Sequence, residues 1–307
     1  MTNLTQLMSQ PANEPAPVPS LRQIPRRYLA LGLICVAIVL LGALVLVRDI
    51  SGPTSTPTVE TFNAAPSSLV STVASVPGSV YDAVGVSSPA NPVTPPGRAG
   101  NGNAPTWLAA EDGGPPLPVV FFYGAEFAPY AAVERWPLIL ALSRFGTFSQ
   151  LGLMQSSATT AFANLSTFTF WKVSYSSRYV ILESVERYSS LDPTGARYLS
   201  LQVPDARQSA AIADYGTNAT TFSLLDVANR FALDGAAFSP AVLAGLSQGQ
   251  IAADLSIPAS PLTQATVTAA NEITAAICSV DGDRPGAVCK SKGVLAADQV
   301  LKVTPPH

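Results

Sequence analysis

The strongest strand signal in the chain is a nearly continuous apolar run, Leu117–Gly124. A strand without alternating polar positions is typical of a sheet that is buried on both faces. A short turn follows, and residues 129–145 then predict a helix. Pro129 suits the first turn of that helix, where a missing N–H costs nothing. Pro137 lies inside the helix and is expected to kink it.

Two runs of aromatic and β-branched residues come next, at 167–175 and 179–185. Ser176 and Ser177 separate these runs, which predicts a β-hairpin. Residues 222–231 predict a further strand and a turn. This order of elements predicts an α/β fold, a sandwich in which helices flank a central mixed sheet.

Local capping signals mark three helix starts in the last third of the chain. Ser239 and Ser260 each precede a proline, the pattern of an N-cap followed by proline at the first helical position. Ser247 and Gln250 have the spacing of a capping box. Apolar residues recur at helical spacing from 267 to 277, so the last of these helices is expected to be long.

The folded domain is predicted to cover residues 67–305. Its first part, 69–86, places valines at helical spacing and predicts a short helix broken near Pro77 and Gly78. Residues 88–116 are rich in proline, glycine and asparagine and predict a long surface loop.

The segment 28–47 carries no charge and is long enough to cross a hydrocarbon core of about 30 Å. Arg22, Arg26 and Arg27 precede it, so the N-terminus is expected in the cytoplasm and the C-terminal domain outside it. We expect a single-pass signal anchor in the cell membrane. The alternative is a cleaved signal peptide, whose apolar core usually spans about 7–15 residues.

The segments on either side of the apolar run are poor in periodic apolar positions. Residues 1–27 predict a disordered cytoplasmic tail. Residues 48–66 are rich in serine, threonine and proline and predict an extended linker.

Composition excludes several functions. Charged residues make up 12% of the chain, the net charge is −3, and no basic cluster exceeds the pair Arg26–Arg27, so a nucleic-acid partner is not expected. The single histidine, His307, is the last residue, which argues against catalytic triads and histidine-ligated metals. We therefore expect no metal and no cofactor. Asp281 and Asp283 lack the remaining ligands of a calcium loop and predict a turn.

Two of the three cysteines, Cys278 and Cys289, lie close together near the C-terminus, while Cys35 lies in the apolar segment. Because Cys278 and Cys289 fall on the exported side of the expected topology, they predict a structural disulfide. A relocated redox pair is the alternative, although the Cys-x-x-Cys spacing is absent.

A family resemblance is carried by residues 124–148, which read Gly-Ala-Glu-Phe-Ala-Pro-Tyr-Ala-Ala-Val-Glu-Arg-Trp and onward to Phe148. This stretch resembles the signature of a thioredoxin-like family of archaea and actinobacteria, the domain of unknown function 929 family. That family carries Cys-Pro-Tyr/Phe-Cys here, followed by Ala-Ala-Glu-Arg-Trp. Ala128 and Ala131 stand at the two cysteine positions, with Pro129 and Tyr130 between them.

The resemblance implies a thioredoxin-like fold whose thiol chemistry has been lost. Relatives place a cis-proline opposite the dithiol, and Ser223 stands at that position here. A non-proline residue in the cis form costs about 2.5–4 kcal/mol, so Ser223 is expected to be trans. Glu126 and Trp136 are candidates to line a residual groove. The alternative for Glu126 is a solvated acid in the turn, and for Tyr130 a half-packed surface position.

Glu134 and Arg135 follow the cysteine positions in the same motif. Their simplest interpretation is an ion pair on the helix surface. An inward-facing salt bridge is the alternative.

Two functions remain open from the sequence. The first is a membrane-anchored, extracytoplasmic pseudo-oxidoreductase that binds an unidentified protein partner, as a scaffold or as an accessory subunit of a membrane complex. The second is a thiol–disulfide oxidoreductase or isomerase that works through Cys278 and Cys289. A cell-envelope protein whose main role is the tether is a third, weaker possibility.

Overall fold

The computed structural model describes residues 61–99, 105–110, 113–191, 197–215 and 222–304. All of these belong to one compact unit, Val59–His307. Among them, no helix has both the length and the apolar character needed to span a bilayer. The predictions for the tail, the segment 28–47, Cys35 and His307 concern residues outside the described ranges.

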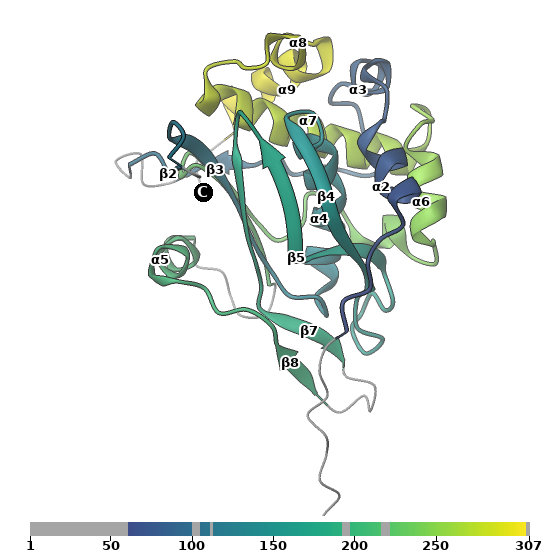
Figure 1. Cartoon of the computed structure of the whole chain (residues 1–307). Helices are drawn as coiled ribbons and strands as arrows, with labels where there is room; N and C mark the ends of the chain where they lie inside the picture. The colour runs from purple at the N-terminus through teal and green to yellow at the C-terminus, as the bar shows by residue number, and fades with distance from the viewer. Residues whose placement is uncertain (1–60, 100–104, 111–112, 192–196, 216–221, 305–307) are drawn as a thin grey trace, which may run out of the picture. The chain divides into compact units, whose positions relative to one another are not determined.

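The core is a six-stranded mixed sheet (Figure 1). Its central strand β3 runs parallel to β6 on one side and antiparallel to β9 on the other, and β10 and β1 extend the β9 side. The short strand β2 pairs with the start of β3. The strands are β1 (Gly97–Arg98), β2 (Leu108–Ala109), β3 (Leu117–Gly124), β6 (Ile181–Glu186), β9 (Ser223–Val227) and β10 (Phe231–Asp234).

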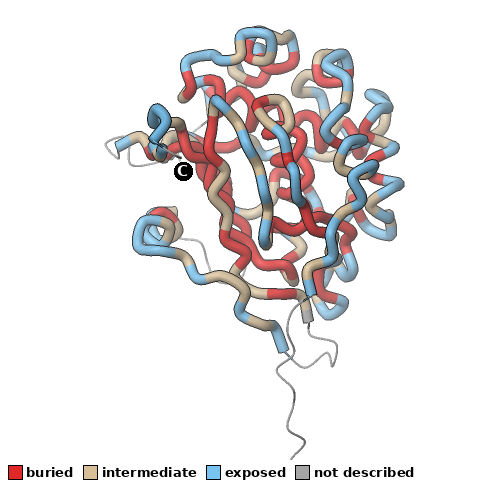
Figure 2. The backbone as a smooth tube through the Cα atoms, in the orientation of Figure 1, coloured by how far each residue is buried: buried red, intermediate tan, exposed pale blue. Residues whose placement is uncertain are grey.

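Alternate residues of β3 serve two different apolar layers, as the twofold period of a strand requires. Val120 and Phe122 belong to the larger cluster, which contains the helices α4 (Pro129–Leu142) and α7 (Pro261–Asp281). Val119 and Phe121 belong to a smaller cluster that includes Ala211 of α5. The continuous apolar run is therefore explained by burial on both faces, visible in the red core of Figure 2.

The remaining helices surround α4 and α7, except α5, which lies on the other side of the sheet (Figure 1). They are α2 (Ser67–Ala74), α3 (Gly78–Val84), α5 (Ala206–Asp214), the 3₁₀ turn η1 (Pro240–Leu243), α6 (Gln248–Asp254), α8 (Gly286–Cys289) and α9 (Lys292–Val303). The break predicted between two short helices near Pro77 is confirmed.

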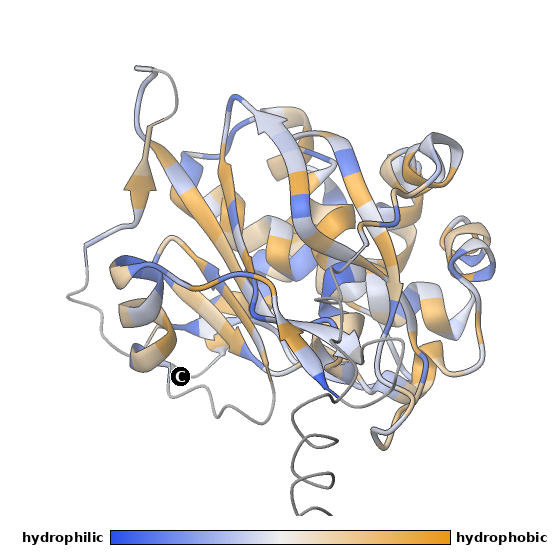
Figure 3. Cartoon of the chain, turned by 60° about the horizontal axis from the view of Figure 1, so that its bottom comes forward, coloured by the Kyte–Doolittle hydropathy of each residue, from blue (hydrophilic) through white to orange (hydrophobic). Residues whose placement is uncertain are grey.

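The predicted hairpin between the two aromatic runs is wrong. The first run forms β5 (Ser166–Ser177), which pairs antiparallel with β4 (Gly146–Gln155), a strand missed from the sequence. The second run forms β6, which pairs with β3. The chain is redirected after β5 because the Ser177 hydroxyl accepts from the N–H groups of Tyr179 and Val180, at 3.0 and 3.4 Å. Figure 3 shows that the central strands are mainly hydrophobic, whereas β4 and β5 carry both hydrophobic and hydrophilic residues.

Two segments predicted as loop or linker belong to the fold. Within 88–116, Trp107 is only 1% exposed and its ring lies 5.2 Å from that of Phe121. Within 48–66, the described residues 61–66 pack on β4: Ala64 forms a bridge with Gly152, and the Ala65 N–H donates to the Leu151 carbonyl at 2.8 Å. The polar composition of both segments gave no sign that they pack on the fold, because a two-residue strand or a single bridge needs few apolar residues.

The capping signals have three different outcomes. Ser247 and Gln250 form the predicted capping box of α6. Ser239 caps as predicted, since its side chain accepts from the Ala241 N–H, although only a 3₁₀ turn follows. Ser260 precedes α7 but makes no cap bond; its hydroxyl donates to the Asp254 carboxylate instead.

Candidate functional site

The candidate site is the corner where β3 ends and α4 begins. Gly124 is the last residue of β3, Ala128 is the N-cap of α4 and Pro129 occupies its first turn, as predicted. The N–H of Ala128 donates to the Ala125 carbonyl at 3.1 Å, which closes the turn. A methyl side chain cannot cap, so no side-chain hydrogen bond satisfies the first N–H groups of α4.

Both alanines of the motif are buried at this corner. Ala128 is 1% exposed and Ala131 is 0% exposed. A Cβ added to Gly124 would lie 2.6 Å from a Phe122 ring carbon and 3.3 Å from the Ala131 Cβ. The glycine therefore leaves room mainly for the Phe122 ring, and the start of α4 lies close beside it.

Four aromatic side chains gather beside the corner, and we call them the aromatic cover: Phe127, Tyr188, Tyr198 and Phe222. The Phe127 ring stacks on Tyr198 at 4.2 Å and meets Phe222 edge-on at 5.1 Å. Tyr188 and Phe222 are 5.6 Å apart. Such pairs contribute beyond their buried area. Sequence reasoning missed the cover because its members are separated by up to 95 positions along the chain.

The structure places Ser223 beside the corner. It is the first residue of β9 and lies opposite Gly124 in the ladder. The cis peptide bond found among the described residues is Arg284–Pro285, so the bond before Ser223 is trans, as expected. Ser223 is fully buried, and its hydroxyl has no hydrogen-bond partner among the described residues.

Two of the sequence-based assignments for this corner need correction. Glu126 is not a solvated acid, because it is only 3% exposed and its N–H donates to the Tyr188 carbonyl at 2.8 Å. Trp136 does not line a groove; it is fully buried, and its indole N–H donates to the Ser166 carbonyl at 3.1 Å. Tyr130, 38% exposed, is at the half-packed surface position that was one of the expectations.

Glu134 and Arg135 do not form a surface pair, because α4 is enclosed on nearly every side. Arg135 instead forms a fully buried, two-pronged ion pair with Glu186 at the end of β6, with N–O distances of 2.9 and 2.7 Å. The same guanidinium donates to the Ala125 carbonyl at 3.1 Å. Arg135 therefore fixes the corner to the neighbouring strand.

Glu134 points away from that ion pair, into the interface between α4 and α7. One carboxylate oxygen accepts from the Ala237 N–H at 3.0 Å, and the other has no partner among the described residues. The pKa of Glu134 is raised to about 8, mainly by burial; the hydrogen bond from the Ala237 N–H opposes the rise and Glu272 on α7 adds to it. Burial also raises the pKa of Glu272 to about 8. The two acids are thus held in their protonated form near neutral pH.

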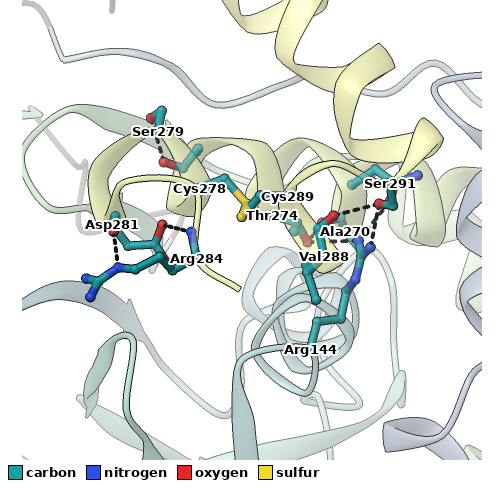
Figure 4. Close-up of a disulfide and its surroundings, with 12 residues drawn as sticks. Arg144, Ala270, Thr274, Cys278, Ser279, Asp281, Arg284, Val288, Cys289 and Ser291 are labelled. Atoms are coloured by element: carbon teal, nitrogen blue, oxygen red, sulfur yellow. Dashed lines mark hydrogen bonds between the residues drawn. A yellow bond between two sulfur atoms is a disulfide. The ribbon is translucent and has the colours of Figure 1, made fainter. Parts of the chain in front are cut away.

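Cys278 and Cys289 are joined by a disulfide between the end of α7 and α8, with their Cα atoms 5.6 Å apart (Figure 4). Each cysteine is 4% exposed. Nearby, Arg144 donates to Ser291 at 3.0 Å and to Asn271 at 3.2 Å. Within the described ranges, no group of three or more His, Cys, Asp or Glu side chains is placed to hold a metal ion.

Comparison with known proteins identifies one family. No curated protein matches the chain, and no solved structure matches it. The model of a family described as "Domain of unknown function (DUF929)" matches residues 115–279, which is more than half of the 307 residues and includes the corner, Ser223 and both buried acids. The chain therefore belongs to the DUF929 family.

Proposed function

We propose that this chain is a membrane-anchored, extracytoplasmic, thioredoxin-like protein without dithiol activity, which binds a protein partner as a scaffold or as an accessory subunit of a membrane complex. One observation carries the proposal. The strand-to-helix corner that would hold a reactive thiol pair holds two buried methyl groups, Ala128 and Ala131.

The strand order supports the thioredoxin-like assignment. β3, α4 and β6 form a unit of two parallel strands joined through a helix, and β9, β10 and α7 form a second unit that begins with an antiparallel pair. β3 and β9 join the two units. Thioredoxin-like proteins have this order, and Ser223 then occupies the position of their cis-proline. The β4–β5 pair is an insertion between α4 and β6.

The loss of chemistry follows from the atoms at the corner. Thiol–disulfide exchange needs one thiolate that attacks a sulfur and a second thiol that resolves the mixed disulfide. Alanine provides neither. The second candidate, an oxidoreductase using Cys278 and Cys289, gains no support from the geometry, because each cysteine of the disulfide is only 4% exposed.

The corner retains a surface on which a partner can bind. Tyr130 and Tyr198 are 38% and 36% exposed, although large aromatic side chains prefer burial. Exposed tyrosines are enriched at protein interfaces, where the ring buries apolar area and the hydroxyl keeps a polar contact. In this proposal the segment 28–47 anchors the chain in the membrane and positions this surface outside the cytoplasm.

An insulin-reduction assay tests the absence of dithiol activity. The full-length chain in mild detergent is expected to reduce insulin no faster than detergent alone. Cys278→Ser with Cys289→Ser serves as the matched variant. Turnover that disappears in this variant would contradict the proposal and establish the second candidate.

Co-purification from membranes tests the binding role. Tyr198→Ala is expected to lose a partner that the wild-type chain retains, because it removes the most exposed ring of the aromatic cover. Leu295→Ala is the control, since Leu295 is 50% exposed on α9, outside the corner. Equal retention by both variants would exclude the corner as the binding surface. Release of the whole chain by alkaline carbonate would exclude the anchor.

A further inference from the structure

An exposed asparagine in the loop between β4 and β5 has the sequence of an N-glycosylation acceptor. Asn164, Leu165 and Ser166 match the pattern Asn-x-Ser, in which the middle residue is not proline. Asn164 is exposed, whereas Leu165 and Ser166 are buried. Its backbone φ of 55° lies in the left-handed region, which asparagine adopts more readily than most residues. The asparagine therefore lies at the surface, the position that a bulky, solvated modification requires.

The loop around Asn164 is held in shape by other residues. The Ser156 N–H donates to the Leu165 carbonyl at 3.0 Å, and the Leu165 N–H donates back to the Ser156 hydroxyl oxygen at 3.0 Å. The same hydroxyl donates to the Phe162 carbonyl at 3.2 Å. None of these bonds uses the Asn164 side chain, so a sugar attached there leaves them intact.

The side-chain amide of Asn164 makes no hydrogen bond to any other part of the chain that the structure describes. By contrast, the side-chain amides of Asn91, Asn229 and Asn271 each donate to a backbone carbonyl, at 3.3, 3.1 and 3.0 Å. None of these three is followed by serine or threonine two positions later. The acceptor sequence and an amide that the fold does not use thus coincide at Asn164.

A polar hollow beside this loop offers space for a sugar. It has a volume of about 550 Å³, and Asn164 lines it together with Asn63, Gln155 and Gln248 among other residues. Sugar hydroxyl groups can both donate to and accept from side-chain amides. The surroundings of Asn164 are therefore compatible with an attached sugar.

We propose that Asn164 carries an N-linked oligosaccharide. The inference rests on the extracytoplasmic location in the proposed function, because transfer takes place outside the cytoplasm from an oligosaccharide linked to a polyprenyl phosphate or pyrophosphate. In the transfer, a bond forms between Nδ2 of Asn164 and the anomeric carbon of the first sugar. The bond from that carbon to the lipid phosphate oxygen breaks, the phosphate leaves with the electron pair, and the amide loses one proton. Because Ser166 is only 2% exposed, transfer must precede the folding of β5.

Peptide mass spectrometry of the full-length chain, purified from the cells that naturally produce it, tests this inference. The peptide that contains Asn164 is expected to carry the added mass of one or more sugars. Asn218 has the same acceptor pattern but lies outside the described ranges, so the sugar must be assigned to its peptide. Migration of the whole chain on a gel would not distinguish the two positions.

The decisive variant is Ser166→Ala, which destroys the acceptor pattern but keeps Asn164 and its backbone conformation. It is expected to abolish the added mass on this peptide. The only side-chain hydrogen bond that it removes is a long one, at 3.5 Å, from Gln155. Asn63→Ala is the control, because Asn63 is exposed and lines the same hollow but has no acceptor pattern. It should retain the sugar.

Protease added to spheroplasts separates a failure of this inference from a failure of the proposed location. An unmodified Asn164 in a chain that the protease cleaves would overturn the inference alone. An unmodified Asn164 in a protected chain would overturn both. Sugar on Asn3, which has the acceptor pattern in the predicted cytoplasmic tail, in place of Asn164 would also overturn both. Added mass that persists in Ser166→Ala would overturn the N-linked assignment.

Discussion

Glu134 and Arg135 are consecutive residues of α4, and both are fully buried, yet their charges are accommodated in opposite ways. Arg135 meets a carboxylate, Glu186, whose oxygens also accept from the Phe170 N–H at 3.0 Å. Glu134 meets a second acid, Glu272, and each of them keeps an oxygen without a described partner. One site is stable because charges are paired, and the other because its charges are removed by protonation.

The two sites show where polar groups remain necessary in this fold. The first turn of α4 buries only two alanines, Ala131 and Ala132, while the second turn carries two ionisable residues at 0% exposure. Glu186 and Arg135 tie β6, α4 and the corner together, so the scaffold needs them whether or not the corner performs chemistry.

The largest effect is expected from breaking the paired site. Glu186→Gln leaves the Arg135 charge buried without its counter-ion, and such a change typically costs about 3–5 kcal/mol of unfolding free energy. Urea denaturation at pH 7 measures it. Glu183→Gln is the matched control, because Glu183 lies on the same strand, is only half-buried and accepts one hydrogen bond from Gln208. Equal losses of unfolding free energy in the two variants would contradict a specific contribution of the Arg135–Glu186 ion pair.

An effect with a defined sign is expected from the unpaired site as pH changes. In the folded state burial raises the pKa of both Glu134 and Glu272 to about 8, from an ordinary value of 4.5. Below about pH 4.5 both acids are protonated whether the chain is folded or not, so their contribution is fully present. As pH rises towards 8, the unfolded chain releases these protons first, and the free energy of unfolding should fall.

Denaturation midpoints at pH 5 and pH 8 measure this dependence. The double variant Glu134→Gln with Glu272→Gln cannot ionise at these positions and should lose less stability over the same range. Burial raises the pKa of Asp226 and of Asp281 to about 6, which adds a loss of the same sign to both proteins. The difference between wild type and variant is therefore the relevant quantity. Identical pH profiles would contradict the assignment.

The smallest effect on unfolding free energy is expected from breaking an exposed ion pair, which serves as the comparison for the buried one. Lys302 and Asp298 lie one helical turn apart on α9 at 2.6 Å, with side chains 54% and 31% exposed. Solvent screens this pair, so Lys302→Gln should change the unfolding free energy by less than about 0.5 kcal/mol. The same urea titration measures it. A loss that approaches the loss in Glu186→Gln would contradict the distinction between buried and exposed pairs.

Elements with strong local signals were predicted well from the sequence. β3 runs from Leu117 to Gly124 as its apolar run indicated, α4 begins at Pro129, and the α6 capping box is present. In each case the signal and the structure it specifies lie within about ten consecutive residues. The mixed sheet with flanking helices also agrees with the predicted order of elements.

Features that depend on distant partners were not predictable in the same way. β4 has few β-branched residues and is held in place by β5, so it left no clear pattern. The inward orientation of Arg135 depends on Glu186, 51 positions later. The burial of Glu126 depends on the chain around Tyr188. A single sequence carries no direct record of these contacts, because local propensity is overridden by tertiary packing.

The burial of Ala128 and Ala131 has a consequence for any attempt to introduce thiols at this corner. Cysteines introduced at 128 and 131 would be buried at positions where the packing now surrounds two methyl groups. Each sulfur would replace a hydrogen at a position that is 1% or 0% exposed. Two substitutions would therefore supply the Cys-x-x-Cys spacing without solvent access, and a reactive pair would also require the rings around the corner to be remodelled.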